Sequence, residues 1–353
     1  MSHPVRVLVV DDSALVRGIL AQGLARDPGI EVVGTATDPY NARDKIVELR
    51  PDVLTLDVEM PRMDGVEFLR KLMPQYPLPV VMVSALTEKG KQITLDALDA
   101  GAVDFVTKPR ADIARGLQGM LMELRTKVKL ASTANVSHWK RKRSAPRDTP
   151  VKVTSKALAE STDKVIAIGA STGGTEAIRE VVTRFPATTP GVVVVQHMPA
   201  GFTRMFAERL NNLCPMEVKE ARDGDRVMAG RVLLAPGGHH MRVARHGGQY
   251  QVEVAAGAPV MGHCPSVEVL MKSVAEQVGP NALGVMLTGM GRDGSGGMKS
   301  MREAGARCIA QDEATCVVFG MPKEAFDNGG AERLVPLDQI AQTVMDLLAG
   351  MVK

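Results

Sequence analysis

The stretch VIAIGASTGGTEAIRE, residues 165–180, decides the fold expected for the C-terminal half of the chain. Four apolar residues lead into the turn-forming letters GASTGG, and a helix-like segment follows. This order predicts a buried strand, a tight turn and a helix. Within the turn, Ser171 stands between Gly169 and Gly173, which is the G-x-S-x-G pattern of a serine lifted above a sheet edge as a nucleophile.

Three other kinds of loop, none of which uses a serine nucleophile, can also connect a strand to a helix at this point. A dinucleotide-binding loop would have glycine at position 171, and a phosphate-binding P-loop would have lysine where Thr175 stands. A plain tight turn without chemistry also fits, because short patterns often occur by chance. The turn alone therefore does not identify Ser171 as a nucleophile. That assignment requires a base and an orienting residue elsewhere in the sequence.

Candidate partners of Ser171 follow other predicted strands. His197 comes directly after the Val-rich strand in GVVVVQHMP, and Asp293 lies in the Gly-rich segment LTGMGRDG after a further strand. Because parallel strands place their carboxyl ends at one edge of a sheet, the three side chains are expected to share one crevice. The chain order serine, histidine, aspartate differs from that of α/β-hydrolases, so the usual wiring of that fold is not expected. Three loop histidines are rivals of His197 for the role of base: His239, His240 and His263.

Strands and helices alternate along most of the chain, which is typical of parallel sheets with crossover helices. In the first half, strands are expected at Val5–Val10, Val53–Leu56, Val80–Val83 and Val103–Val106, with a closing helix from Ala111 to Leu130. In the second half they are expected at Val165–Ile168, Val192–Gln196, Val232–Leu234, Leu283–Leu287 and Cys308–Ala310. We therefore expect two doubly wound α/β domains, at 1–125 and 163–353, joined by a polar, basic linker at 126–162.

Polar residues follow the strands of the first domain at the points where these strands end. Asp11 and Asp12 follow the first strand, Asp57 follows the second, and Ser84 and Lys108 end the last two. Three carboxylates brought together would repel one another, and a hard divalent cation such as Mg²⁺ would resolve that conflict. A carboxylate between a metal ion and a lysine is suited to accept a phosphoryl group. Each residue alone could equally be a helix cap or a turn residue.

The segments VLVVDDSALVR, PDVLTLDVEMPRMDG, VVMVSALT and GAVDFVTKP together resemble a response-regulator receiver domain with a flavodoxin-like sheet. The resemblance implies that Asp57 accepts the phosphoryl group. It implies that Mg²⁺ is held by Asp11, Asp12, Asp57 and the backbone carbonyl of Glu59. It also implies that Ser84 and Phe105 couple phosphorylation to a surface change and that Lys108 binds the phosphate.

The segments IAIGASTGGTEAI, QHMPAGFT, LTGMGRDG and CVVFGMP resemble the catalytic domain of the chemotaxis protein-glutamate methylesterase (CheB) family. The resemblance implies Ser171 as nucleophile, His197 as base and Asp293 as the residue that orients His197. It further implies Thr172 as a neighbour of the histidine and the Met290 N–H as an oxyanion donor. The segment HCPSVEVLM departs from the family pattern, because arginine is expected at Cys264 and aspartate at Glu268.

The same resemblance implies a function. The expected reaction is hydrolysis of glutamate methyl esters, and deamidation of certain glutamines, on methyl-accepting chemotaxis receptors, in chemotactic adaptation. A chemotaxis histidine kinase is the expected phosphodonor, and ester hydrolysis is expected to need no cofactor. We further hypothesise that the unphosphorylated receiver covers the catalytic crevice, since a switch domain is tethered to an enzyme by a linker.

Composition narrows the range of function classes. The net charge of +3 can be accounted for by the basic cluster around Lys140–Arg143, so a solvated linker is preferred to a nucleic-acid site. The four cysteines lack CxxC spacing and no apolar leader or spanning segment is evident, so a cytoplasmic monomer without membrane insertion is expected. A DNA-binding regulator is disfavoured by the strand–helix alternation of the second half. A non-enzymatic receptor adaptor is disfavoured by the presence of serine, histidine and aspartate together.

Overall fold

The computed structural model describes residues 3–85, 87–109, 113–140 and 163–351. The chain forms two compact units, Met1–Pro146 and Arg147–Lys353. Most of the linker expected at 126–162, including Arg141–Arg143, lies outside the described residues.

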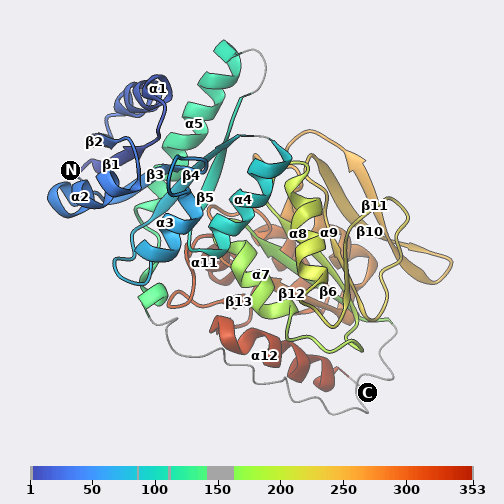
Figure 1. Ribbon diagram of the computed structural model, residues 1–353. Helices are drawn as coiled ribbons and strands as arrows, with labels where there is room; N and C mark the ends of the chain where they lie inside the picture. The colour runs from blue at the N-terminus through green and yellow to red at the C-terminus, as the bar shows by residue number, and fades with distance from the viewer. Residues whose placement is uncertain (1–2, 86, 110–112, 141–162, 352–353) are drawn as a thin grey trace. The chain divides into compact units, whose positions relative to one another are not determined.

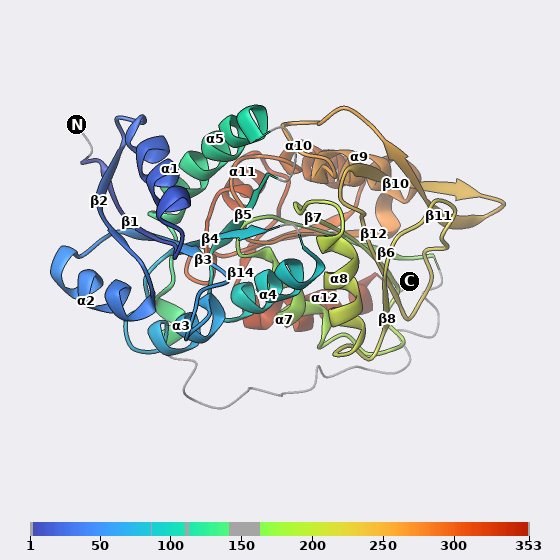
Figure 2. The same ribbon diagram turned by 45° about the horizontal axis from the view of Figure 1, so that its top comes forward.

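The N-terminal unit is a five-stranded parallel sheet with the strand order β2-β1-β3-β4-β5. Its strands are β1 (Val5–Val10), β2 (Ile30–Ala36), β3 (Val53–Asp57), β4 (Val80–Ala85) and β5 (Asp104–Lys108). Its helices are α1 (Ala14–Ala25), α2 (Pro39–Leu49), α3 (Gly65–Leu72), α4 (Glu88–Asp99) and α5 (Ile113–Ala131), followed by the short 3₁₀ helix η1 (Ser137–Lys140). Helices α1 and α5 cover one face of the sheet, and α2, α3 and α4 cover the other (Figures 1 and 2). This order is that of flavodoxin-like folds, as predicted.

The sequence accounts for these elements locally. The central strands β3 and β4 are mostly apolar and almost completely buried, as expected for strands of a parallel sheet that helices cover on both faces. Strand β2 was not predicted, since it lies at the edge of the sheet and most of its residues are only partly buried. Helix α5 continues to Ala131, so the boundary expected at residue 125 falls inside it, and Leu124 and Val128 are fully buried on either side of that point.

The C-terminal unit contains a seven-stranded parallel sheet with the order β14-β13-β12-β6-β7-β9-β8. Its strands are β6 (Val165–Ala170), β7 (Gly191–Gln196), β8 (Glu217–Glu220), β9 (Arg231–Leu234), β12 (Ala282–Met286), β13 (Arg307–Gln311) and β14 (Leu334–Val335). Its helices are α7 (Gly174–Val182), α8 (Phe202–Asn211), α9 (Val267–Gln277), α10 (Ser295–Glu303), α11 (Met321–Asp327) and α12 (Leu337–Gly350), with the 3₁₀ helix η2 (Gly279–Asn281). The fold class predicted for this half is confirmed.

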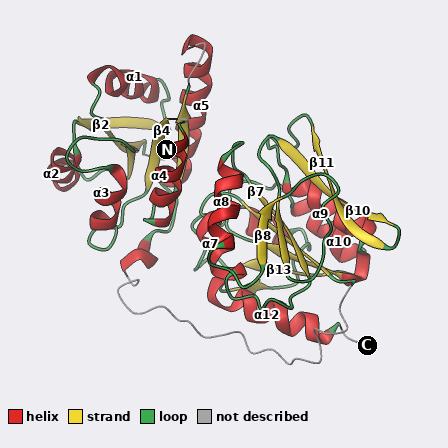
Figure 3. Ribbon diagram, turned by 45° about the vertical axis from the view of Figure 1, so that its right-hand side comes forward, coloured by secondary structure: helices red, strands yellow, loops and turns green. Residues whose placement is uncertain are grey.

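An antiparallel hairpin of β10 (His239–His246) and β11 (Gln249–Ala256) projects from this unit (Figures 2 and 3). The hairpin was not predicted, and neither were the short strands β8 and β14. Its buried side chains Met241, Val243 and Val252 belong to the same apolar core as Leu270 and Val274 of α9. The hairpin is thereby fixed to the helix that begins beside the site described below.

The order of the seven strands reverses at β6. The chain runs from β6 outward through β7 on one side, and it returns through β12 on the other. Such a reversal separates the two neighbouring crossover connections and leaves space for a site at the carboxyl ends of the strands. Ser171, His197 and Asp293 follow β6, β7 and β12, the three strands that meet at this reversal.

Candidate functional site

Ser171, His197 and Asp293 form a continuous chain of hydrogen bonds. His197 Nδ1 lies 3.1 Å from Ser171 Oγ, and His197 Nε2 lies 2.7 Å from Asp293 Oδ2. The side chains of His197 and Asp293 are 7% and 1% exposed, and Ser171 is partly exposed, so the exposed part of this chain lies at the serine. The arrangement is that of a nucleophile, a base and a residue that orients the base.

The two ring nitrogens of His197 have different partners, and this difference defines its neutral form. The carboxylate of Asp293 only accepts hydrogen bonds, so the ring proton belongs on Nε2. Nδ1 then carries a lone pair that faces the Ser171 hydroxyl. In the triad of the chymotrypsin-type serine proteases, the histidine Nε2 faces the serine and Nδ1 faces the aspartate. The two ring nitrogens of His197 have exchanged these partners.

Asp293 is held by four hydrogen bonds at the N-terminus of α9. Besides His197, its donors are the Ser266 hydroxyl at 2.8 Å, the Val267 N–H at 2.7 Å and the Glu268 N–H at 3.0 Å. Burial alone would raise the pKa of Asp293, but these hydrogen bonds outweigh burial and keep its pKa below the ordinary value. Asp293 is therefore a stable carboxylate facing the imidazole.

The backbone around Ser171 and His197 is tied together by Gln196, which sequence analysis missed. Its Nε2 donates to the Ser171 carbonyl at 2.8 Å and to the His197 carbonyl at 3.2 Å. Gln196 is 4% exposed, and a side chain at Gly174 would overlap its Oε1. The Ser171 N–H also donates to the Thr288 carbonyl at 3.0 Å. These bonds fix the backbone of Ser171 relative to that of His197.

The turn that carries Ser171 is sharp at Gly173. Its φ of 76° lies in the left-handed region, which glycine adopts without strain, whereas Ser171 is absent from the residues with positive φ. A side chain at Gly169 would overlap Val267 of α9. Both glycines of the G-x-S-x-G pattern are thus required, one for conformation and the other for close packing.

Thr172 and Met290 lie next to the hydrogen-bonded residues. Thr172 is buried, and its carbonyl accepts a hydrogen bond from Thr288 Oγ1 at 3.0 Å. Met290 follows Gly289, where a side chain would meet Ser171 Cβ at 2.8 Å, so the backbone passes close to the serine. Within the described part of the chain, the Met290 N–H donates to no carbonyl or side chain.

The rival histidines have different surroundings. The His263 ring stacks on the His197 ring, with centroids 3.6 Å apart and planes 10° apart. His240 is buried; its Nε2 lies 2.9 Å from the Ala258 carbonyl, and its Nδ1 accepts from the Ser266 N–H at 3.3 Å. His239 is exposed on β10. The ring with a nitrogen facing Ser171 Oγ at hydrogen-bond distance is that of His197.

The two positions that depart from the family pattern have different environments. Cys264 is half-buried and immediately precedes Pro265. Glu268 is buried, its Oε2 accepts from the Gly297 N–H at 2.8 Å, and its Oε1 lies 3.1 Å from Lys272 Nζ. Glu268 therefore joins α9 to the N-terminus of α10.

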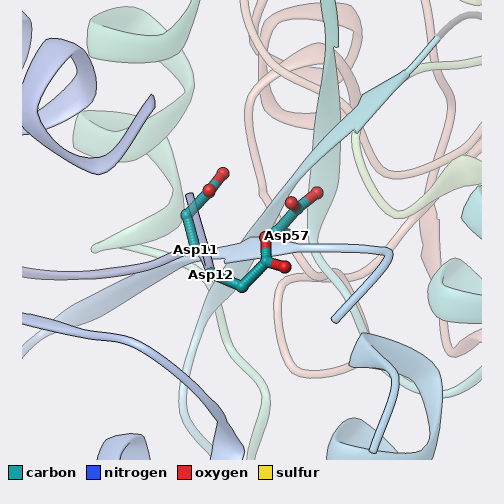
Figure 4. Close-up of side chains that lie close together, drawn as sticks. All are labelled: Asp11, Asp12 and Asp57. Carbon is teal, nitrogen blue, oxygen red and sulfur yellow. The ribbon is translucent and has the colours of Figure 1, made fainter. Parts of the chain in front are cut away.

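A second cluster lies at the carboxyl ends of β1 and β3 in the N-terminal unit. Asp11, Asp12 and Asp57 each present a carboxylate oxygen, and these oxygens lie within 4.8 Å of one another (Figure 4). Lys108 Nζ lies 2.9 Å from Asp57 Oδ2 and 3.1 Å from Asp11 Oδ2. Lys108 thus pairs with two of the three carboxylates, so its single positive charge does not balance the cluster when all three are ionised.

Burial of this cluster changes the acidity of Asp57. Desolvation raises the pKa of Asp57 to about 6, although Lys108 opposes the increase. Asp12 is exposed, so the cluster can be reached from solvent. Oxygen donors with excess negative charge fit a hard divalent cation such as Mg²⁺. The exposed Glu59 follows Asp57 by two residues.

Ser84 and Phe105 are both buried, Ser84 near the end of β4 and Phe105 near the beginning of β5. The Ser84 hydroxyl lies 2.6 Å from Thr94 Oγ1, and Thr94 donates to the Gly90 carbonyl at 2.7 Å. Phe105 packs beneath Lys127 of α5, whose Nζ lies 5.3 Å from the ring centroid. Ser84 is therefore connected to α4, and Phe105 is connected to α5.

Comparisons with known proteins agree over both units. The family model described as CheB methylesterase matches residues 166–344, and that of the response regulator receiver domain matches residues 7–117. A protein of Syntrophotalea carbinolica named protein-glutamate methylesterase/protein-glutamine glutaminase is 72% identical over 349 residues, covering 99% of both chains. A Sulfurimonas denitrificans protein of the same name is 53% identical, covering 98% of this chain and 99% of its own.

A solved structure supports the same relationship for the C-terminal unit. The Thermotoga maritima CheB methylesterase catalytic domain is 36% identical, with a TM-score of 0.52, and the match covers 53% of this chain and 99% of that domain. No helix among the described residues is long and apolar enough to cross a bilayer. The chain therefore belongs to the CheB methylesterase family and carries a response regulator receiver domain in its N-terminal half.

Proposed function

We propose that this protein hydrolyses glutamate methyl esters on methyl-accepting chemotaxis receptors and that phosphorylation of Asp57 stimulates this activity. The observation that carries the proposal is the partly buried chain of hydrogen bonds from Ser171 through His197 to Asp293, at 3.1 and 2.7 Å. The names of the relatives support protein-glutamate methyl esters as the substrate.

In the first half of the reaction, His197 Nδ1 takes the proton of Ser171 Oγ as this oxygen attacks the ester carbonyl. The negative charge that develops on the carbonyl oxygen is stabilised by the Met290 N–H, with Thr172 beside the base. Collapse of the tetrahedral intermediate breaks the bond to the methoxy group, which leaves as methanol with the proton from His197. A glutamyl ester of Ser171 remains.

In the second half, water attacks this ester while His197 accepts its proton. Ser171 leaves with that proton, and the receptor carries a free glutamate. Asp293 keeps the ring proton on Nε2 and stabilises the imidazolium in both halves. A glutamine side chain enters the same sequence and releases ammonia, and it depends more on proton donation because the amine is a poorer leaving group.

The receiver is proposed to set the rate of this reaction. Asp57 accepts the phosphoryl group from a chemotaxis histidine kinase. Asp11, Asp12, Asp57 and the Glu59 carbonyl would hold Mg²⁺, which neutralises phosphoryl charge when bound. Lys108 pairs with the phosphate, and Ser84 and Phe105 transmit the change to α4 and α5. We place this reaction in the cytoplasm, on the cytoplasmic helices of the receptors, and we propose a monomer.

The test is methanol release from methylated receptor membranes by the full-length protein. We expect wild-type release to increase when a small-molecule phosphodonor and Mg²⁺ are added. Asp57→Asn should keep the unstimulated rate and lose the increase. Absence of methanol release from wild type under both conditions would refute the proposed substrate, and an unchanged response in Asp57→Asn would refute the proposed regulation.

A further inference from the structure

Ser266 occupies the N-cap position of α9 but does not cap that helix with its side chain. Serine at this position usually accepts a hydrogen bond from an N–H of the first turn. Here the Ser266 hydroxyl donates to Asp293 Oδ1 at 2.8 Å, and the residue is fully buried. The first turn of α9 is capped by Asp293, from the loop after β12, through the Val267 and Glu268 N–H groups.

Because Asp293 caps α9 and also accepts from the Ser266 hydroxyl, hydrogen-bond donors surround both oxygens of its carboxylate. Its Oδ1 accepts from Ser266 and from the Glu268 N–H, while its Oδ2 accepts from the Val267 N–H and from His197 Nε2. A carboxylate can turn about its Cβ–Cγ bond, and a donor on each oxygen opposes that turn. Ser266 is the one side-chain hydroxyl among these donors.

We propose that Ser266 is a positioning residue that fixes the Asp293 carboxylate so that Oδ2 faces His197. The inference rests on the proposed ester hydrolysis and assigns a further residue to it. Ser266 does not contact the nucleophile. Its own position is set by its backbone N–H, which donates to His240 Nδ1 at 3.3 Å.

The electrostatic role of the Ser266 hydroxyl follows from the charges around Asp293. Among the described residues, the titratable side chains with printed contacts here are His197 on Asp293, His240 on Ser266, and His263, which stacks on His197. The Glu268 side chain is directed to Gly297 and Lys272. A donated hydrogen bond draws negative charge toward Oδ1. Without it, more negative charge faces the imidazole, which stabilises the imidazolium and demands a higher pH to deprotonate the base.

The variant Ser266→Ala removes the hydroxyl and keeps the shape of the site. We expect kcat for methanol release to fall about tenfold, since one hydrogen bond to a charged group is worth on that order. KM should be unchanged, because Ser266 does not contact the substrate. The acid limb of the kcat/KM profile should move to higher pH.

Ser273→Ala is the matched control. Ser273 is also buried on α9, and its hydroxyl donates to the Leu270 carbonyl at 2.7 Å and accepts from the Val243 N–H at 2.9 Å. This variant should lower the stability of the C-terminal unit without moving the pH profile. If Ser266→Ala and Ser273→Ala change kcat and the pH profile equally, Ser266 is only structural and the inference is wrong.

A double-mutant cycle with Asp293→Ala provides the second test. If Ser266 acts through the carboxylate, adding Ser266→Ala to Asp293→Ala should cause no further loss of kcat. A further loss of about tenfold would overturn the inference, because the two residues would then act independently. Failure of wild type to release methanol would instead refute the proposed function, so the two failures are distinguishable.

Discussion

Asp57 and Asp293 are both buried carboxylates that follow strands of parallel sheets, yet their acidities change in opposite directions. Burial raises the pKa of Asp57 to about 6, whereas the pKa of Asp293 lies below its ordinary value. Asp57 has two carboxylates and one lysine beside it. Asp293 has four hydrogen-bond donors, two of them from the first turn of a helix.

The two sites differ in how far the protein compensates the charge of the carboxylate. The charge of Asp293 is fully satisfied within the protein, so it can serve as a fixed partner of His197 through every turnover. The charge of Asp57 is only partly compensated by Lys108, so the site gains from a cation and from a chemical change at the carboxylate. The charge of the same residue type is thus compensated by four donors in one unit and only partly compensated in the other.

Of the two aspartate-to-asparagine replacements, Asp293→Asn is expected to have the largest effect on the rate. Asp293→Asn would present an amide N–H to His197 Nε2 and so favour the ring tautomer that cannot accept the Ser171 proton. We expect kcat to fall about 10⁴-fold, as for the same change in a serine protease triad. Asp57→Asn should leave the rate without phosphodonor unchanged. Methanol release by both variants, with and without phosphodonor, measures this.

Equal losses in the two variants would contradict the division of roles. A thermal unfolding curve of each variant is the control, because loss of a folded C-terminal unit would also abolish activity. If Asp293→Asn keeps more than about a tenth of the wild-type kcat, Asp293 does not set the tautomer of His197.

A smaller effect is expected on the free energy of unfolding of the metal-free protein, and this effect should depend on pH. Because the folded pKa of Asp57 is raised above the ordinary value of 3.8, its ionisation costs stability as pH rises through about 6. Above that pH, Asp57→Asn should stabilise the N-terminal unit by on the order of 3 kcal/mol, and near pH 4 it should not. Mg²⁺ should stabilise wild type more than the variant.

Urea unfolding followed by tryptophan fluorescence measures this prediction in the intact chain. Trp139 is the only tryptophan of the sequence, and its ring lies against Gly101 of the N-terminal unit. A stability difference between wild type and Asp57→Asn that does not change between pH 4 and pH 8 would contradict the raised pKa.

The smallest expected effect concerns Glu268, which departs from the family pattern. Glu268→Gln keeps the length of the side chain and weakens its bonds to Gly297 and Lys272. We expect a loss of about 1 kcal/mol in unfolding free energy, with KM and kcat within about twofold of wild type. A large change in KM with unchanged stability would instead assign Glu268 to substrate binding.

The buried strands and the residues that follow them could be predicted from the sequence, because of the geometry of parallel sheets. Val-rich runs locate the buried strands, and the residues after them, such as Ser171, His197 and Asp57, then lie at one edge by the geometry of parallel sheets. Strand β2 and the hairpin β10–β11 have partly exposed residues, so their apolar signal is weaker. The closing helix expected at Ala111–Leu130 agrees with α5, which ends at Ala131, whereas the domain boundary expected at residue 125 falls inside this helix.

The surroundings of the site could not be predicted from the sequence for a similar reason. Gln196 precedes His197 directly, but its bonds to two backbone carbonyls depend on how β6 and β7 are paired. Ser266 lies 27 residues before Asp293, and only the fold brings them together. The stacking of His263 on His197 also depends on the fold, since a loop histidine has no periodic pattern that would predict its neighbours.

The most direct measurement is the rate of methanol release by Ser171→Ala at saturating methylated receptor, with phosphodonor and Mg²⁺ present. The matched variant is Ser300→Ala, which removes a serine hydroxyl from α10 that donates to the Gly296 carbonyl at 3.2 Å. We predict a loss of at least about a thousandfold for Ser171→Ala, as expected for a nucleophile, and wild-type rates for Ser300→Ala. Methanol release by Ser171→Ala at a rate close to that of wild type would contradict the assignment of this hydroxyl as the attacking group.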